Sequence, residues 1–86
     1  MKLNKIHNKG SLKRLLKRFN NGNKLSYIDG DWKIAVGGYD LWFEIYLKDI
    51  PIVKCIEGKL STCQEVGKKY LDIVKECLPY TVKKTL

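Results

Sequence analysis

The chain has 86 residues, 44% of them hydrophobic and 10% aromatic, and carries a formal net charge of +8. This length accommodates one small domain and excludes a second one, and the apolar share excludes a chain that is disordered throughout. The longest apolar run is far shorter than the ~20 residues of a membrane-spanning helix, so we expect no membrane partner. Three cysteines without a CxxC pair predict reduced thiols in a cytoplasmic protein.

The positive charge is concentrated at the start of the chain. Residues 1–25 hold eight basic residues and no acidic one, whereas residues 26–86 hold nine of each. A coding bias toward lysine explains why arginine is scarce, but it does not explain the absence of acids from the first segment. Segregated basic charge of this kind is typical of proteins that contact phosphates, and it favours a nucleic-acid partner, DNA or RNA.

The sequence predicts three segments. Residues 1–10 form a basic flexible arm, residues 11–79 a single α+β domain, and residues 80–86 a C-terminal tail. His7, the only histidine, lies in the arm. We expect it to be solvated, because a catalytic histidine needs a positioned partner.

The first predicted element is a short amphipathic helix over residues 12–20, with Ser11 as its N-cap. Apolar side chains recur at the spacing of one helix face: Leu12, Leu15, Leu16 and Phe19. The opposite side carries a basic set: Lys13, Arg14, Lys17 and Arg18. The apolar stripe is expected to pack on the core. The basic side is then either a solvated surface or a phosphate-binding one.

A first hairpin is predicted after this helix. Its short strands cover residues 25–28 and 32–36, and the Asp29-Gly30 pair between them is the best turn signal in the chain. The first of these strands is weak.

A second hairpin joins strands over residues 41–47 and Ile50–Ile56 through a two-residue turn, Lys48-Asp49. Because Pro51 has no N–H to donate, the second strand of this hairpin is expected either at an edge of the sheet or to begin one residue later.

A second helix is predicted from Thr62 to Leu78. Thr62 and Glu65 have the spacing of a capping box, and Pro79 ends the helix. The predicted fold is therefore α+β, with a short basic N-terminal helix, a three- or four-stranded antiparallel sheet, and a C-terminal helix packed on the sheet.

The strand over residues 41–47 has two different faces. Trp42, Glu44 and Tyr46 alternate with aliphatic residues and Phe43. If both helices cover the aliphatic face, Trp42 and Tyr46 are exposed and can stack on unpaired bases or anchor a protein partner. If one helix covers each face, they belong to the core. Glu44 between the aromatic residues argues against a surface that follows phosphates.

No enzyme is predicted. The sequence lacks nucleophile motifs, phosphate-loop glycines and paired histidines or cysteines at metal-binding spacing. We therefore expect no catalytic residues, no cofactor and no bound metal. Cys55, Cys63 and Cys77 are interpreted as small hydrophobic residues, with Cys63 and Cys77 on the buried stripe of the second helix.

The element order helix, strands, helix resembles the double-stranded-RNA-binding fold. The strands followed by a Thr-x-x-Glu-Val helix, residues 62–66, resemble the sheet plus helix of integrase arm-binding domains, and HicB-type antitoxins share this pattern. These resemblances imply basic clusters on the second helix or on the strands. Such clusters are sparse in this chain, so we assign no family and transfer no functional residues.

The leading prediction is a small basic nucleic-acid-binding accessory or regulatory protein. Its phosphate contacts are assigned to the N-terminal basic residues: Lys2, Lys5, Lys9, Lys13, Arg14, Lys17 and Arg18. The alternative is a protein-binding module, such as a phage or mobile-element inhibitor or an antitoxin-like partner. It would act through Trp42 and Tyr46 or through the edge strand at Ile50–Ile56, and a homodimer through the aromatic face is a further alternative.

Overall fold

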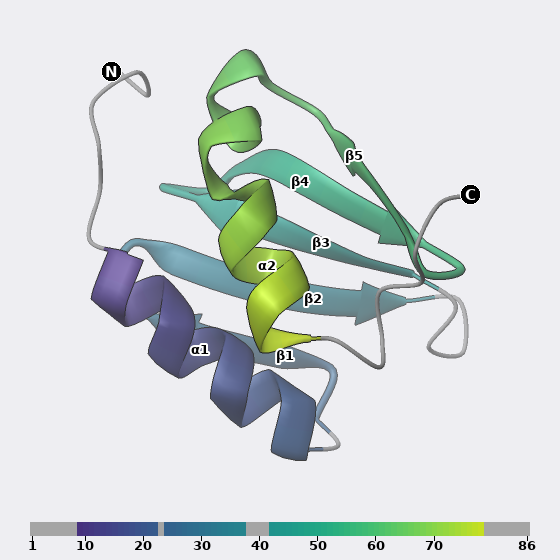
Figure 1. The fold of residues 1–86 in the computed structure, drawn as a ribbon. Coiled ribbons are helices and arrows are strands. Elements are labelled where there is room, and N and C mark those ends of the chain that lie inside the picture. Colours follow the sequence, from purple (N-terminus) through teal and green to yellow (C-terminus); the bar gives the residue numbers. More distant parts are fainter. Residues whose placement is uncertain (1–8, 23, 38–41, 79–86) are drawn as a thin grey trace.

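The computed structural model describes residues 9–22, 24–37 and 42–78 (Figure 1). The elements, in chain order, are α1 (Lys9–Asn21), β1 (Ser26–Asp29), β2 (Trp32–Gly37), β3 (Trp42–Leu47), β4 (Ile50–Ile56), β5 (Lys59–Thr62), the 3-10 helix η1 (Glu65–Tyr70) and α2 (Leu71–Cys77). The predicted arm and tail lie outside the described residues, except that Lys9 and Gly10 belong to α1.

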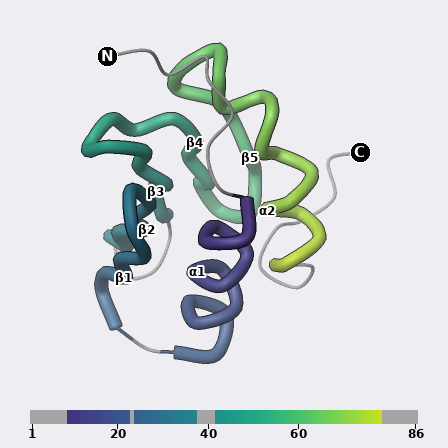
Figure 2. The backbone as a smooth tube through the Cα atoms, turned by 90° about the vertical axis from the view of Figure 1, so that its left-hand side faces the viewer, coloured from purple at the N-terminus to yellow at the C-terminus, as the bar shows by residue number. Residues whose placement is uncertain are grey.

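The five strands form one antiparallel sheet in the order β1-β2-β3-β4-β5, so each strand pairs with its neighbour in the chain. Both helices lie against the same face of this sheet, which gives two layers (Figure 1, Figure 2). The α+β class and the order helix, sheet, helix are confirmed. The expected three or four strands are wrong, because the sheet has five.

The strand that the sequence analysis missed is β5 (Lys59–Thr62), which holds a single large apolar residue. The Cys63 N–H, directly after it, donates to the Ile52 carbonyl at 2.9 Å, which continues the contact with β4. The predicted capping box is therefore wrong, because Thr62 ends a strand and helical structure begins only at Glu65, without a side-chain cap. Pairing with β4 prevails over the local capping signal.

The second helix is also less regular than predicted, since its first half is the 3-10 helix η1. A Cβ at Gly67 would overlap the carbonyl group of Ile52. Glycine at this position thus allows η1 to approach β4 closely.

Two turns show how the hairpins close. Lys48 and Asp49 have φ values of 50° and 67°, the pair of left-handed residues that a type I′ turn requires, which confirms the predicted hairpin. Gly30 has a φ of 61°, but Asp29 is the last residue of β1, so the first turn lies one residue later than predicted.

The prediction of an edge strand at Ile50–Ile56 is wrong, because β4 lies between β3 and β5. Pro51 is accommodated next to a bulge, where the register with β3 shifts between Ile45 and Tyr46. β5 pairs with β4 only from Val53 onward, so Pro51 interrupts no ladder with β5.

The core fills the space between the sheet and the helices. Leu12, Leu15 and Leu16 of α1 are fully buried, as the predicted apolar stripe requires. Trp32 of β2 meets Tyr70 of η1 edge-to-face, with ring centroids 4.8 Å apart.

The start of α1 differs from the prediction. The helix begins at Lys9, so Ser11 is a buried position inside the helix and not its N-cap. The Ser11 hydroxyl accepts a hydrogen bond from Arg14 Nη2 at 3.2 Å instead.

Candidate nucleic-acid interface

The exposed side of α1 carries basic residues in two rows, because positions four residues apart lie one above the other on a helix. These are the lysine row, Lys9, Lys13 and Lys17, and the arginine pair, Arg14 and Arg18. Of the other predicted phosphate contacts, Lys2 and Lys5 lie outside the described residues.

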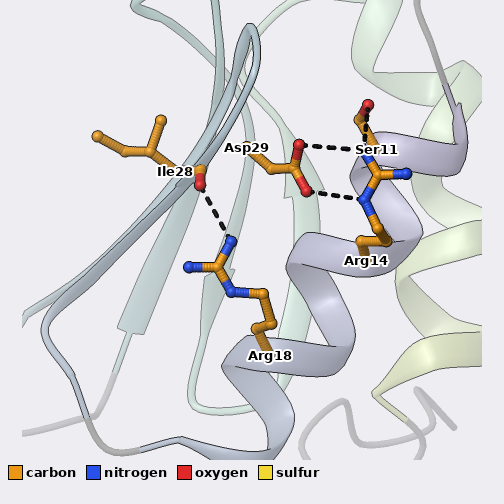
Figure 3. A network of polar contacts seen from close by, with 5 residues as sticks. All are labelled: Ser11, Arg14, Arg18, Ile28 and Asp29. Atoms are coloured by element: carbon orange, nitrogen blue, oxygen red, sulfur yellow. Dashed lines mark hydrogen bonds and ion pairs between the residues drawn. The ribbon is translucent and has the colours of Figure 1, made fainter.

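The arginine pair ties α1 to the edge strand β1 (Figure 3). Arg14 donates from Nε to Asp29 Oδ2 at 3.1 Å and from Nη2 to Asp29 Oδ1 at 3.3 Å. Arg18 donates from Nη1 to the Ile28 carbonyl at 3.2 Å. The hydrogen bond to Asp29, together with its charge, raises the pKa of Arg14. Both guanidinium groups therefore bind residues of β1, the edge strand of the sheet, which could otherwise pair with a strand of another molecule.

The lysine row has no such contacts. Its three side chains belong to exposed residues, and they make no hydrogen bond or ion pair with any other residue that the structure describes. The row borders α2: burial raises the pKa of the Cys77 thiol, while the positive charges of Lys13 and Lys17 act in the opposite direction. Within the described part of the chain, the three lysines of the row are therefore charges without an ion-pair partner.

The lysine row destabilises α1 electrostatically. Like charges four residues apart destabilise a helix by about 0.2–0.5 kcal/mol per pair. In addition, the first turn of α1 contains Lys9 and no acidic residue, so its charge opposes the helix dipole. An anion bound along the row would relieve both effects.

The sheet face turned away from the helices is a second candidate surface, here called the open sheet face. Strand alternation and register place on it the side chains of Ile28, Lys33, Trp42, Glu44, Tyr46, Lys54, Ile56 and Lys59. Trp42 is 36% exposed and Tyr46 is half-buried. Because both helices cover the other face, neither aromatic residue belongs to the core, contrary to the arrangement with one helix on each face.

The indole ring of Trp42 lies flat on the open sheet face. A Cβ on the neighbouring Gly37 would overlap Trp42 Cζ2 and would lie 2.7 Å from both adjacent ring atoms, Cε2 and Cη2. An edge-on ring would hold those two atoms farther away, so the ring turns one face toward Gly37 and the other face away from the sheet. Ile56, which is 48% exposed, lies opposite Trp42 in the register.

Tyr46 is held by polar neighbours on the same face. Its hydroxyl donates to Glu44 Oε1 at 3.2 Å, and Lys33 Nζ lies 5.4 Å from the centroid of its ring. Burial raises the pKa of Tyr46, and the charge of Glu44 adds to this effect. Tyr46 is therefore less available to a ligand than Trp42.

No metal site or membrane helix emerges from the described residues. They contain no group of three or more His, Cys, Asp or Glu side chains that could hold a metal ion. None of the helices they form is long and apolar enough to cross a membrane. Cys55, for which the sequence predicted no face, is buried. The prediction that Cys63 lies on the buried stripe of the second helix is wrong: Cys63 is exposed, because it follows β5 and precedes the helical residues.

Sequence reasoning missed two features. It did not separate the basic residues of α1 into the arginine pair and the lysine row, and it did not assign lysines of β4 and β5 to the open sheet face. The helical spacing of Arg14 and Arg18 could be recognised in the sequence. However, Asp29, which binds Arg14, lies 15 positions away, and no local sequence pattern indicates that the two residues meet. Lys54 and Lys59 have the alternation of the open sheet face, yet assigning them to it required the register of β4 with β3 and β5.

Comparisons with known proteins do not identify the chain: no family model matches it, and no match exists among curated proteins or solved structures.

Proposed function

We propose that this chain is a small nucleic-acid-binding protein of accessory or regulatory type, with phosphate contacts from the lysine row of α1. One observation carries the proposal: Lys9, Lys13 and Lys17 are exposed without partners among the described residues, while the adjacent arginine pair is occupied within the fold. Lys2 and Lys5, which precede the row in the sequence, are proposed to add further phosphate contacts.

The chemistry of such contacts defines the expected behaviour. Lysine ammonium groups bind phosphates as point charges, and phosphate contacts carry no sequence information. The binding should therefore depend steeply on salt and only weakly on base sequence.

A salt titration of binding to fluorescent single-stranded and duplex DNA and RNA tests this proposal. Each phosphate contact contributes about 0.7–0.9 to the slope of log K against log salt. Substitution of the lysine row, Lys9→Gln, Lys13→Gln and Lys17→Gln, should reduce the slope by about 2–3.

The matched control removes the same charge elsewhere: Lys48→Gln, Lys68→Gln and Lys75→Gln, in the β3–β4 turn, η1 and α2. It should leave the slope close to that of the wild type. Absence of binding at ~50 mM salt, where phosphate contacts are strong, would overturn the proposal, as would equal slopes for the two triple variants.

A second candidate function is a protein-binding module that uses the open sheet face. The observation in its favour is the exposure of three large apolar side chains on that face, Ile28, Trp42 and Ile56. Sedimentation measurements over a range of concentrations test the simplest form, a homodimer, which the double variant Trp42→Ala, Tyr46→Ala should dissociate. A monomer at all concentrations excludes that form.

A further inference from the structure

Trp42 has the geometry of a stacking platform. One face of its ring is supported by Gly37, and the opposite face points away from the sheet. Gly37 and Trp42 are direct partners in the β2–β3 register, so the backbone on both sides of the ring is fixed by strand pairing. A planar group can stack on this ring without any rearrangement of the sheet.

The residues around Trp42 supply positive charge. Ile56 lies opposite Trp42, and Lys59 lies opposite Ile56, which brings Lys59 into the same row across the sheet. Lys54 occupies the next row, opposite Glu44. Glu44 already accepts a hydrogen bond from Tyr46, and no ion pair between Glu44 and Lys54 is formed.

The charge of the open sheet face indicates which kind of ligand can bind there. Among the strand residues that the structure describes on this face, three lysines, Lys33, Lys54 and Lys59, stand against one carboxylate, that of Glu44. A second copy of the chain would bring two faces with excess positive charge together, which is unfavourable. An anionic ligand with planar apolar groups can neutralise the lysines and also stack on the exposed ring.

We infer that the open sheet face binds unpaired bases of a single-stranded nucleic acid, with Trp42 as the stacking platform and Lys54 and Lys59 on the adjacent phosphates. The inference rests on the proposed nucleic-acid-binding function and specifies its ligand class. Paired bases are buried in the duplex stack, so only a strand with splayed bases can use the ring. Because α1 lies on the other side of the sheet, the lysine row and Trp42 can be tested separately (Figure 2).

Intrinsic fluorescence provides the readout. Trp32 is 1% exposed and Trp42 is 36% exposed, so a change of emission on binding reports on Trp42. Short oligo(U) and oligo(dT) strands should quench this emission, and a duplex of equal length should not. Anisotropy of labelled strands then gives the Kd of variants that lack the tryptophan.

Trp42→Ala should weaken single-strand binding at least about fivefold, and Trp42→Phe, which keeps a ring, should restore most of the affinity. The matched control is Leu25→Ala, which removes an exposed apolar side chain outside the open sheet face and should bind as the wild type does. Circular dichroism checks that each variant is folded.

Three results would overturn the inference while the proposed function stands. The first is binding that depends on the lysine row but has the same Kd in Trp42→Ala and the wild type. The second is a duplex bound as tightly as a single strand and with the same quenching. Self-association that Trp42→Ala abolishes would assign the face to a second copy and also overturn it. Failure of every nucleic acid to bind would reject the proposed function itself.

Discussion

The two faces of the sheet are built from the same strands by the same alternation, yet they have opposite characters. On the covered face, Ile34, Ile45 and Leu47 are almost fully buried beneath α1 and α2. On the open sheet face, lysines lie among apolar and aromatic side chains that remain partly or largely exposed. The comparison shows that strand alternation sorts residues into two sets, and that the helices then decide which set becomes core and which remains available for a ligand.

The sharpest test of this comparison uses two isoleucines in neighbouring strands. Ile45→Ala on the covered face should lower the free energy of unfolding by about 2–5 kcal/mol, because it leaves a cavity in a packed core. Ile56→Ala on the open sheet face should change it by no more than about 0.5 kcal/mol. Urea unfolding followed by circular dichroism measures both, and equal losses would contradict the assignment of the two faces.

Two glycines extend the comparison to close contacts. Gly67→Ala forces a methyl group against the Ile52 carbonyl on the covered side, so we expect a loss of about 1–3 kcal/mol although alanine is the better helix former.

At Gly37 on the open sheet face, the atoms nearest to an added methyl group belong to the Trp42 ring, a side chain that can swing outward in Gly37→Ala. We expect a loss below about 1 kcal/mol and a shift of the Trp42 emission toward that of a solvated indole. If Gly37→Ala proved the more damaging of the two, the ring of Trp42 would be fixed more rigidly than the fold implies.

Within α1, two adjacent basic residues can be compared, because replacing either one with glutamine removes one positive charge. Arg18→Gln removes the hydrogen bond to the Ile28 carbonyl and should destabilise the protein by about 0.5–1 kcal/mol. Lys17→Gln removes one charge of the repelling lysine row and should leave stability unchanged or raise it by up to about 0.5 kcal/mol. Thermal unfolding at low salt resolves the pair. Equal effects would mean that the lysine row also has a structural role.

The smallest expected effect concerns the thiols. Burial raises the pKa of Cys55 and of Cys77, whereas Cys63 is exposed. Alkylation followed by mass spectrometry should therefore modify Cys63 first, then Cys77, and Cys55 last. Reaction of Cys55 before Cys63 in the folded protein would contradict the placement of β5.

The same pKa shifts predict a pH dependence. The fold favours the protonated form of these thiols, so their contribution to stability is fully present below the ordinary thiol pKa of ~8.5 and declines as pH rises through the higher folded values. Unfolding measured from pH 7 to pH 10 should show this decline, and Cys55→Ser should reduce it.

Several features could be predicted from the sequence alone because their causes are local. The apolar stripe of α1 and the alternation in β2 and β3 follow from residue spacing, and the structure confirms them. The turn at Lys48-Asp49 is confirmed as well, although it was located by the gap between two apolar runs and not by a preferred turn pair. The concentration of basic residues in the first 25 positions is likewise a property of the sequence, and it led directly to the candidate interface.

The remaining features depend on partners that lie far away in the chain. β4 became an interior strand because β5 pairs with it, and the same pairing removed Thr62 from the predicted helix cap. Asp29 and Ile28 engage the arginine pair but not the lysine row, a distinction that no helical periodicity contains. The alternation in the sequence already marked the aliphatic side of β3 as core, but whether the opposite sheet face stays open was decided only when both helices packed on one side.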